Sequence, residues 1–146
     1  MNIAIGSDHA GFERKQEILK HLLSLGHEVQ DLGTYSKDSM DYPDIAVEVA
    51  LKVAQNQVER GVLICGSGIG VSIVANKTEG VRAANCVNEE MAQMARQHND
   101  ANVLTLGERL VDKTTAINMV DIFLTTSFEG GRHEQRVSKI HDLTGR

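Results

Sequence analysis

The chain has 146 residues, of which 41% are hydrophobic and 24% are charged. This length fits one domain, and the composition excludes a disordered or a membrane-embedded chain. The net charge of −5 argues against a nucleic-acid or acidic-membrane surface spread over the whole chain, although a local basic cluster could still bind a small anion.

Two features favour a cytoplasmic protein. The first residues, MNIAIGSDHAGF, contain no basic segment followed by a long apolar stretch, and no apolar run approaches the roughly 20 residues that a membrane-spanning helix needs. Cys65 and Cys86 each end an apolar run, without CxxC spacing or a secreted context. We therefore expect two free thiols.

The first part of the chain alternates strand and helix patterns. Residues 2–6 (NIAIG) form an apolar run typical of a strand, residues 12–25 have helical spacing, and residues 27–33 (HEVQDLG) contain a second short apolar piece. Residues 34–43 form a polar loop with the only proline, and helical spacing resumes from about 44 to 58.

The same alternation continues to the end of the chain. Residues 62–65 (VLIC) are continuously apolar and rich in β-branched side chains, which indicates a central buried strand. The remaining expected elements are helices at 71–77, 88–99, 112–125 and 134–143 and strands at 81–86 and 102–107. Because parallel neighbours need crossover connections, this order predicts a mostly parallel sheet with helices on both faces. We expect one domain over residues 1–146, a three-layer αβα sandwich with a Rossmann-like sheet.

Ligands of open α/β sheets bind where the carboxyl ends of strands meet loops. This rule places SDHAG, CGSGIG and the residues after NVLTLG on one rim. Glycines in CGSGIG let the backbone approach a ligand, with N–H groups beside the positive end of a helix dipole. The segment is typical of an anion cradle. It is not the GxGxxG of a dinucleotide fold, and no GK[ST] follows as in a P-loop.

Cys65 immediately precedes this cradle. An isolated apolar cysteine is usually a small core residue. A thiol beside a glycine loop and a helix N-terminus can instead serve as a base or nucleophile, and we favour that interpretation for Cys65. Cys86 has no such loop, so we interpret it as a core residue.

His9 follows the first expected strand, and His98 precedes the strand expected at 102–107. His98 and Asn99 close a helix before the strand NVLTLG, where an imidazole on the rim suits general acid–base chemistry, although a surface histidine capping a helix remains an alternative. Asp8 and His9 follow the first strand. They could bind a metal ion, but no HxxxH or CxxC spacing completes a site, so we expect no metal.

Three arginines are candidates for binding a phosphate. Arg109 follows NVLTLGE, and Arg132 and Arg136 would share one face of a helix. The planar fork of arginine matches phosphate oxygens, whereas a single arginine is more often a solvated surface charge. The lead-in EGG at 129–131 favours a loop that faces a ligand.

The sequence resembles the type B ribose-5-phosphate isomerases over almost its whole length. The motifs that carry the resemblance are SDHAGF (7–12), DYPD (41–44), ICGSGIGVSIVANK (64–77), VRAA (81–84), RQHNDANVL (96–104) and FEGGRHEQRV (128–137). The family includes isomerases of allose 6-phosphate and galactose 6-phosphate. The resemblance implies an aldose–ketose isomerase of the pentose phosphate pathway that needs neither cofactor nor metal.

The resemblance also implies a role for each candidate residue. Cys65 would move a proton between C1 and C2 through a cis-enediolate, and His98 would assist opening of the furanose ring. The anion hole would be formed by Gly66, Ser67, Gly68, Ile69 and Gly70, the hydroxyls and ring oxygen would be bound by Asp8, His9 and Asn99, and the phosphate would be bound by Arg109, Arg132 and Arg136. Position 67 is Ser where several relatives have threonine, and both carry a hydroxyl.

The family shares its active site between two subunits, which implies a homodimer or a dimer of dimers, with no nucleic-acid or membrane partner. Two alternatives stay open. The substrate could be a 6-phosphorylated aldohexose, or the chain could be a phosphate- or nucleotide-binding module without catalysis.

Overall fold

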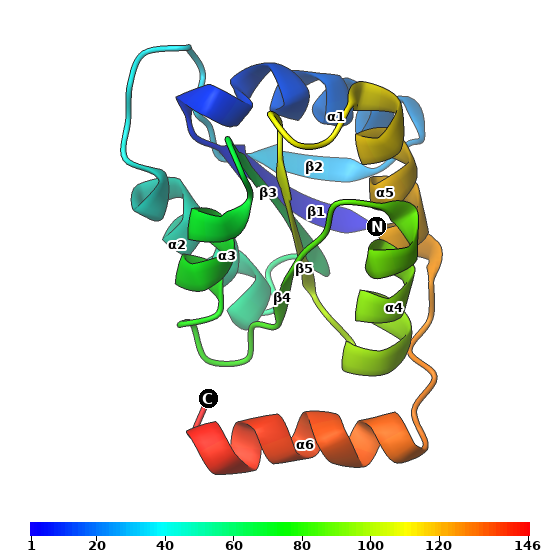
Figure 1. Cartoon of the computed structure of the whole chain (residues 1–146). Coiled ribbons are helices and arrows are strands. Elements are labelled where there is room, and N and C mark those ends of the chain that lie inside the picture. The colour runs from blue at the N-terminus through cyan, green and yellow to red at the C-terminus, as the bar shows by residue number, and fades with distance from the viewer.

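Five parallel strands form the central sheet of the molecule, in the order β2-β1-β3-β5-β4 (Figure 1). The computed structural model describes residues 1–146. The strands are β1 (Asn2–Ser7), β2 (Glu28–Asp31), β3 (Arg60–Cys65), β4 (Ala83–Asn85) and β5 (Val103–Gly107). Every adjacent pair is parallel, which confirms the predicted sheet.

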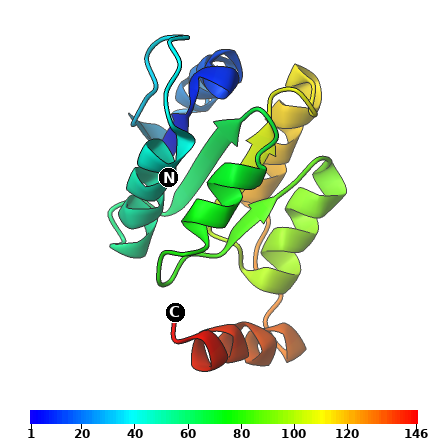
Figure 2. The ribbon, with the colours of Figure 1, turned by 60° about the vertical axis from the view of Figure 1, so that its left-hand side comes forward.

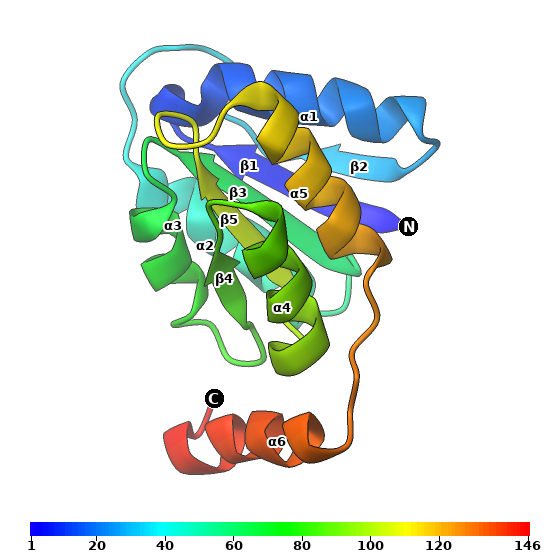
Figure 3. The ribbon, with the colours of Figure 1, turned by 45° about the vertical axis from the view of Figure 1, so that its right-hand side comes forward.

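Helices cover both faces of this sheet, as the alternation of elements predicts. They are α1 (Phe12–Ser24), α2 (Tyr42–Ala54), α3 (Ile69–Ala75), α4 (Glu89–Asn99), α5 (Lys113–Thr125) and α6 (Arg132–Thr144). In Figure 2, α2 and α3 lie in front of the sheet, and in Figure 3, α4 and α5 do, with α1 beside them. The helix α6 lies apart from both layers, below α4 in Figures 1 and 3. No helix has the length and apolar content needed to cross a membrane.

Strand periodicity divides the buried side chains between two cores. On β1, Ile3 and Ile5 point to the side of α1 and α5, whereas Ala4 points to α2. All three side chains are fully buried. Burying an isoleucine contributes about 1.5–3 kcal/mol, so the apolar runs that define the strands also hold the helices on the sheet.

Two helix boundaries differ from the sequence prediction. The helix α2 ends at Ala54, not near residue 58, because Asn56 adopts a left-handed φ of 55°. Val58 is nevertheless buried, and its apolar character extended the helical pattern beyond the helix. The helix α3 begins at Ile69, inside the glycine loop, because Gly68 with φ 78° serves as its N-cap.

Candidate active site

The order in which the chain adds strands to the sheet reverses between β1 and β3. From β1 it goes to β2 on one side, and from β3 it goes to β4 and β5 on the other. Open α/β sheets bind ligands outside the carboxyl ends of the strands at such a point. Asp8 follows β1 and Cys65 ends β3, and the Asp8 N–H donates to the Ile64 carbonyl over 3.3 Å. Both predicted residues therefore lie at the topological switch point.

A depression of about 400 Å³ opens at this point. Seven of the predicted site residues line it, together with Ala10, Tyr42 and Leu110: Asp8, His9, Cys65, Gly66, Ser67, Gly70 and Arg109. The depression joins the loops after β1, β3 and β5, as the rim argument predicts. Gly68 and Ile69 belong to the same loop but do not line it.

The glycine loop arranges its N–H groups around the Cys65 thiol. Cys65 is only 5% exposed, and its Sγ accepts the N–H of Gly68 over 3.1 Å. This hydrogen bond fixes the position of the sulfur at the mouth of the glycine loop. The N–H groups of Ser67 and Gly70 have no acceptor within the protein, so they are free to bind an anion.

The loop after β5 packs tightly against the glycine loop. Backbone N–H groups of Glu108 and Arg109 donate to the carbonyls of Cys65 and Gly66 over 2.9 and 3.1 Å. A Cβ on Gly107 would lie 2.5 Å from the Ser67 carbonyl carbon, so only glycine allows this approach. The Arg109 guanidinium consequently lies over Gly66, where an added Cβ would be 3.1 Å from Nη1. Arg109 is thus placed to bind an anion in the depression.

The groups after β1 have fixed hydrogen-bonding roles. The Nδ1 of His9 accepts the N–H of Met40 over 3.2 Å, which leaves the proton of the neutral imidazole on Nε2. His9 can therefore donate a hydrogen bond from Nε2. Asp8 Oδ1 accepts the N–H groups of Ala10 and Gly11 over 3.0 and 3.1 Å, so this carboxylate also stabilises the short 3₁₀ turn His9–Gly11.

Tyr42 is a wall of the depression that the sequence argument missed. Its ring lies against Gly70, where an added Cβ would be 2.7 Å from Cζ. The side chain is 39% exposed at the start of α2. The proline of the motif DYPD indicated the start of a helix, but nothing in the sequence related Tyr42 to the glycine loop.

Cys86 is the core residue that its sequence context predicts. It is 1% exposed and belongs to the core beneath α4 and α5. Burial raises the pKa of its thiol to about 11, so it is protonated at neutral pH.

His98, Asn99, Arg132 and Arg136 lie outside the depression. The prediction that they share the rim with Cys65 is wrong for a single chain. His98 and Asn99 end α4, and the residue just before β5, Asn102, pairs with Gly61 near the start of β3 over 3.0 Å. Cys65 is at the other end of β3, roughly 13 Å away at the usual rise per residue. A helix that precedes a parallel strand ends at the amino edge of the sheet.

These residues form a second group at the corner of α4 and α6. The rings of His98 and His133 stack, with centroids 4.5 Å apart and an interplanar angle of 15°. Arg132 and Arg136 are exposed on the first turns of α6 beside them. Burial of the His133 imidazole and the positive charges of its neighbours lower its pKa.

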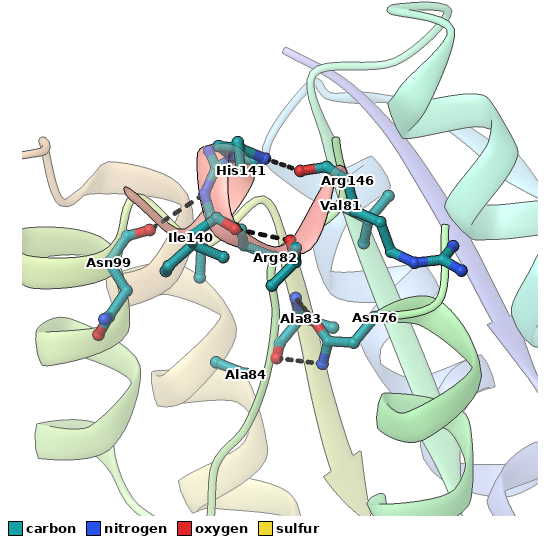
Figure 4. Close-up of a pocket in the computed structure, with 11 residues that line it drawn as sticks. Asn76, Val81, Arg82, Ala83, Ala84, Asn99, Ile140, His141 and Arg146 are labelled. Atoms are coloured by element: carbon teal, nitrogen blue, oxygen red, sulfur yellow. Dashed lines mark hydrogen bonds between the residues drawn. The ribbon is translucent and has the colours of Figure 1, made fainter. Parts of the chain in front are cut away.

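The largest hollow of the molecule, about 470 Å³, lies between α6 and the edge strand β4 (Figure 4). Arg82 crosses it, donating from Nε to the Asn99 carbonyl over 3.1 Å and from Nη1 to His141 Nε2 over 3.0 Å. These bonds hold α6 on the body of the protein. No cysteine or glycine loop lines this hollow, so the depression around Cys65 is the better candidate for the active site although it is smaller.

Comparison with known proteins identifies relatives along nearly the full length. Residues 3–140 match the model of the Ribose/Galactose Isomerase family. Ribose-5-phosphate isomerase B of Escherichia coli is 51% identical over 138 residues, which cover 94% of this chain and 93% of that protein. A probable ribose-5-phosphate isomerase B of Mycoplasma genitalium is 49% identical, with coverage of 95% and 93%.

Solved structures agree with this result. The ribose-5-phosphate isomerase B of Clostridium thermocellum superposes with a TM-score of 0.98 at 50% identity, covering 99% of this chain and 98% of that one. The Mycoplasma genitalium enzyme with bound ribulose-5-phosphate superposes with a TM-score of 0.95 at 47% identity, with coverage of 99% and 97%. The sequence motifs, the fold and these similarities agree, and the chain belongs to the ribose/galactose isomerase family.

Proposed function

We propose that the protein interconverts ribose 5-phosphate and ribulose 5-phosphate. The observation that carries this proposal is the Cys65 Sγ, which accepts the Gly68 N–H over 3.1 Å in a depression that also contains Arg109. A base, an anion cradle and a phosphate-binding cation are the groups that aldose–ketose isomerisation of a sugar phosphate requires. Relatives named ribose-5-phosphate isomerase B, about half identical in sequence, support the same substrate.

The proton transfer would begin at C2 of the open-chain aldose. The Cys65 thiolate removes the C2 proton, the C–H electron pair forms the C1=C2 bond, and the carbonyl pair moves to O1. The resulting cis-enediolate is an anion, which the free N–H groups of Ser67 and Gly70 would stabilise. Transfer of the O2 proton to O1 and return of a proton to C1 give the ketose. No electron acceptor is consumed.

Binding would orient the sugar phosphate for this step. Arg109 would hold the phosphate by charge-assisted hydrogen bonds, and the Nε2–H of His9 would donate to a substrate oxygen. His98 would act as the acid–base group that opens the furanose ring. Asn99, Arg132 and Arg136 would complete the hydroxyl and phosphate contacts.

We further propose that the complete site requires a second copy of the chain. His98 and Arg132 are remote from Cys65 within one chain, so a symmetric dimer would have to present the α4–α6 corner of one copy to the depression of the other. Exposed apolar side chains support such an interface. Ile69 and Ile73 on α3 are 54% and 56% exposed, and Met91 and Met94 on α4 are 37% and 38% exposed.

Mixing two inactive variants tests the shared site. Cys65→Ala chains and His98→Asn chains, unfolded and refolded together, would form hybrid dimers in which one site carries neither substitution. A statistical mixture should recover about a quarter of the unmodified activity. If Cys65 and His98 served the same site from one chain, every site would carry a substitution and no activity would return.

The substrate assignment is tested by comparing kcat/KM for five- and six-carbon aldose phosphates. The family description includes galactose isomerases, which makes a hexose phosphate the second candidate. We expect the pentose phosphate to be preferred. A clear preference for allose 6-phosphate or galactose 6-phosphate would overturn the assignment while leaving the chemistry intact.

The base is tested by the initial rate of ribulose 5-phosphate formation with chelator present. Cys65→Ala should lower kcat about 10³-fold, the range of general base catalysis, while substrate still binds calorimetrically. The matched control is Cys86→Ala, which removes the buried thiol and should retain activity. Full activity of Cys65→Ala would exclude the thiol from the mechanism. Tight dinucleotide binding without turnover would support the non-catalytic alternative.

A further inference from the structure

Two histidines and a glutamate converge at the α4–α6 corner, outside the depression that contains Cys65. His98 is in the last turn of α4, Glu129 is in the segment between α5 and α6, and His133 is the second residue of α6. One ligand atom from each lies within 4.8 Å of the others. The His133 Nε2 and the Glu129 Oε2 are 3.5 Å apart.

Backbone contacts hold these three residues together. The Glu129 N–H donates to the Gln97 carbonyl over 3.1 Å, next to His98 on α4. The His133 N–H donates to the Gly130 carbonyl over 3.0 Å. A further bond runs from Arg96 Nε to the Thr126 carbonyl over 3.3 Å. The segment before α6 is therefore anchored to α4 at Thr126 and at Glu129, and the fold brings the ligand atoms close together.

The chemistry of the three side chains selects a class of ion. Two imidazoles and one carboxylate suit Zn²⁺ and neighbouring divalent transition metals, whereas Mg²⁺ and Ca²⁺ prefer oxygen ligands alone. Arg132 and Arg136 lie close enough for their positive charges to act on His133. That field opposes a cation held by charge alone, so an ion at this corner must gain its affinity from bonds to the imidazole nitrogens.

The present spacing requires a small adjustment. Two ligand atoms of a tetrahedral zinc site are about 3.3 Å apart at bond lengths near 2.0–2.1 Å. Glu129 is 49% exposed and can change rotamer, and the half-buried ring of His98 can rotate away from its stacked position. His133, with a side chain only 9% exposed, is the fixed member of the set.

We propose that His98, Glu129 and His133 form a binding site for Zn²⁺ or a similar divalent transition metal, and that the bound ion inhibits the enzyme. Three protein ligands leave one position for water or an anion. The inhibition rests on the proposed function, because an imidazole whose nitrogen binds a metal cannot transfer a proton in ring opening. The isomerisation itself still requires no metal, so chelator should preserve activity and Zn²⁺ should suppress it.

Binding is measured first, independently of catalysis. Chelator-treated protein is titrated with Zn²⁺ by calorimetry and with Co²⁺ by visible absorption. We expect one high-affinity ion per chain and a cobalt spectrum without the intense thiolate charge-transfer band that ligation by Cys65 or Cys86 would produce. Glu129→Gln and His133→Asn should each weaken the affinity about tenfold or more.

A matched control separates this site from an ordinary histidine–carboxylate pair. His21 Nε2 lies 2.7 Å from Asp121 Oδ1 between α1 and α5, but no second imidazole is part of that pair. His21→Gln should leave the Zn²⁺ affinity unchanged. Equal affinity in Glu129→Gln, His133→Asn and the unmodified protein, or a thiolate band with Co²⁺, would overturn the site.

Inhibition is measured second. Zn²⁺ should slow the isomerisation of ribose 5-phosphate, chelator should restore it, and Glu129→Gln should need about tenfold more Zn²⁺ for the same inhibition. Zn²⁺ bound at the cluster without any change in rate would overturn the inhibitory role. If no sugar phosphate is isomerised, the proposed function fails, while the calorimetric result still decides the metal site.

Discussion

The two groups of candidate residues are built in different ways. The depression around Cys65 is held by backbone, since Gly68 donates to the sulfur and the N–H groups of Glu108 and Arg109 bind the glycine loop. At the corner of α4 and α6, one backbone hydrogen bond joins Glu129 to α4, and α6 itself is held by side chains, the stacked imidazoles and an arginine that reaches across a hollow. The first group joins loops that follow neighbouring strands of the sheet, whereas the second joins two helices and the segment that precedes α6.

This difference indicates which part of the molecule is rigid and which can adjust. Buried backbone hydrogen bonds between neighbouring strands open only with the core. The helix α6 has one buried residue, His133, and contacts mainly α4. The proposed cradle for the enediolate is therefore preorganised, whereas the groups on α6 have more freedom to shift.

Among variants that change how the two groups are held in place, Gly68→Ala should have the largest effect. Gly68→Ala would require a side chain at φ 78° and would place Cβ 2.2 Å from the Asn85 Oδ1. Displacing the loop removes the N–H that binds Cys65, so kcat should fall about 100-fold, as for loss of an oxyanion donor. Steady-state kinetics of the purified variant checks this.

Gly80→Ala is the matched control for that substitution. Gly80 has φ 79°, yet no atom lies within 4 Å of an added Cβ. It carries the same backbone strain, about 1–2 kcal/mol of stability, without disturbing the cradle. Equal losses of activity in the two variants would mean that general destabilisation, not the geometry at Cys65, causes the effect.

A smaller effect is expected at the wall of the depression. Arg109→Ala removes the guanidinium that lies over Gly66 and should raise KM for the sugar phosphate about 10- to 100-fold, the value of one or two charge-assisted hydrogen bonds. The kcat should change less, because the phosphate is remote from C1 and C2. A fall in kcat at unchanged KM would assign Arg109 to the reacting atoms instead. Lys113→Ala, an exposed charge on the following helix, is the control.

Much of the fold could be predicted from the sequence because each element has a local signal. VLIC is apolar throughout and forms the last four residues of β3, which is covered on both faces. Asn88 and Asp112 cap α4 and α5 with their own side chains, which fixes where those helices begin. The rim of Asp8, Cys65 and Arg109 followed from the rule for strand ends, which depends only on the parallel order.

The position of His98 could not be predicted by the same rule. The loop before a strand and the loop after a strand look alike in composition, but they lie at opposite edges of a parallel sheet. The cluster of His98, Glu129 and His133 was missed for a related reason, because its members come from two helices and the segment between α5 and α6, and no fixed spacing relates them. Tertiary packing alone brings them together.

The smallest expected effect concerns the attachment of α6 to the rest of the protein. His141→Ala removes the acceptor of Arg82 Nη1, a bond of 3.0 Å between α6 and the body. One hydrogen bond of this kind contributes about 1 kcal/mol, so the free energy of unfolding should fall by that amount or less. Amide hydrogen exchange should quicken in α6 and remain unchanged in β3. His27→Ala, at the far edge of the sheet beside β2, controls for loss of a histidine.

Steady-state kinetics of His141→Ala test whether the attachment of α6 also affects substrate binding. If Arg132 and Arg136 bind the phosphate from α6, looser attachment of that helix should raise KM a few fold and leave kcat nearly constant, since the Cys65 cradle is untouched. Unchanged KM together with faster exchange in α6 would mean that the arginines act independently of how α6 is docked. His141→Ala loosens the side-chain attachment of α6 and leaves the backbone hydrogen bonds around Cys65 in place, so the depression serves as the internal reference.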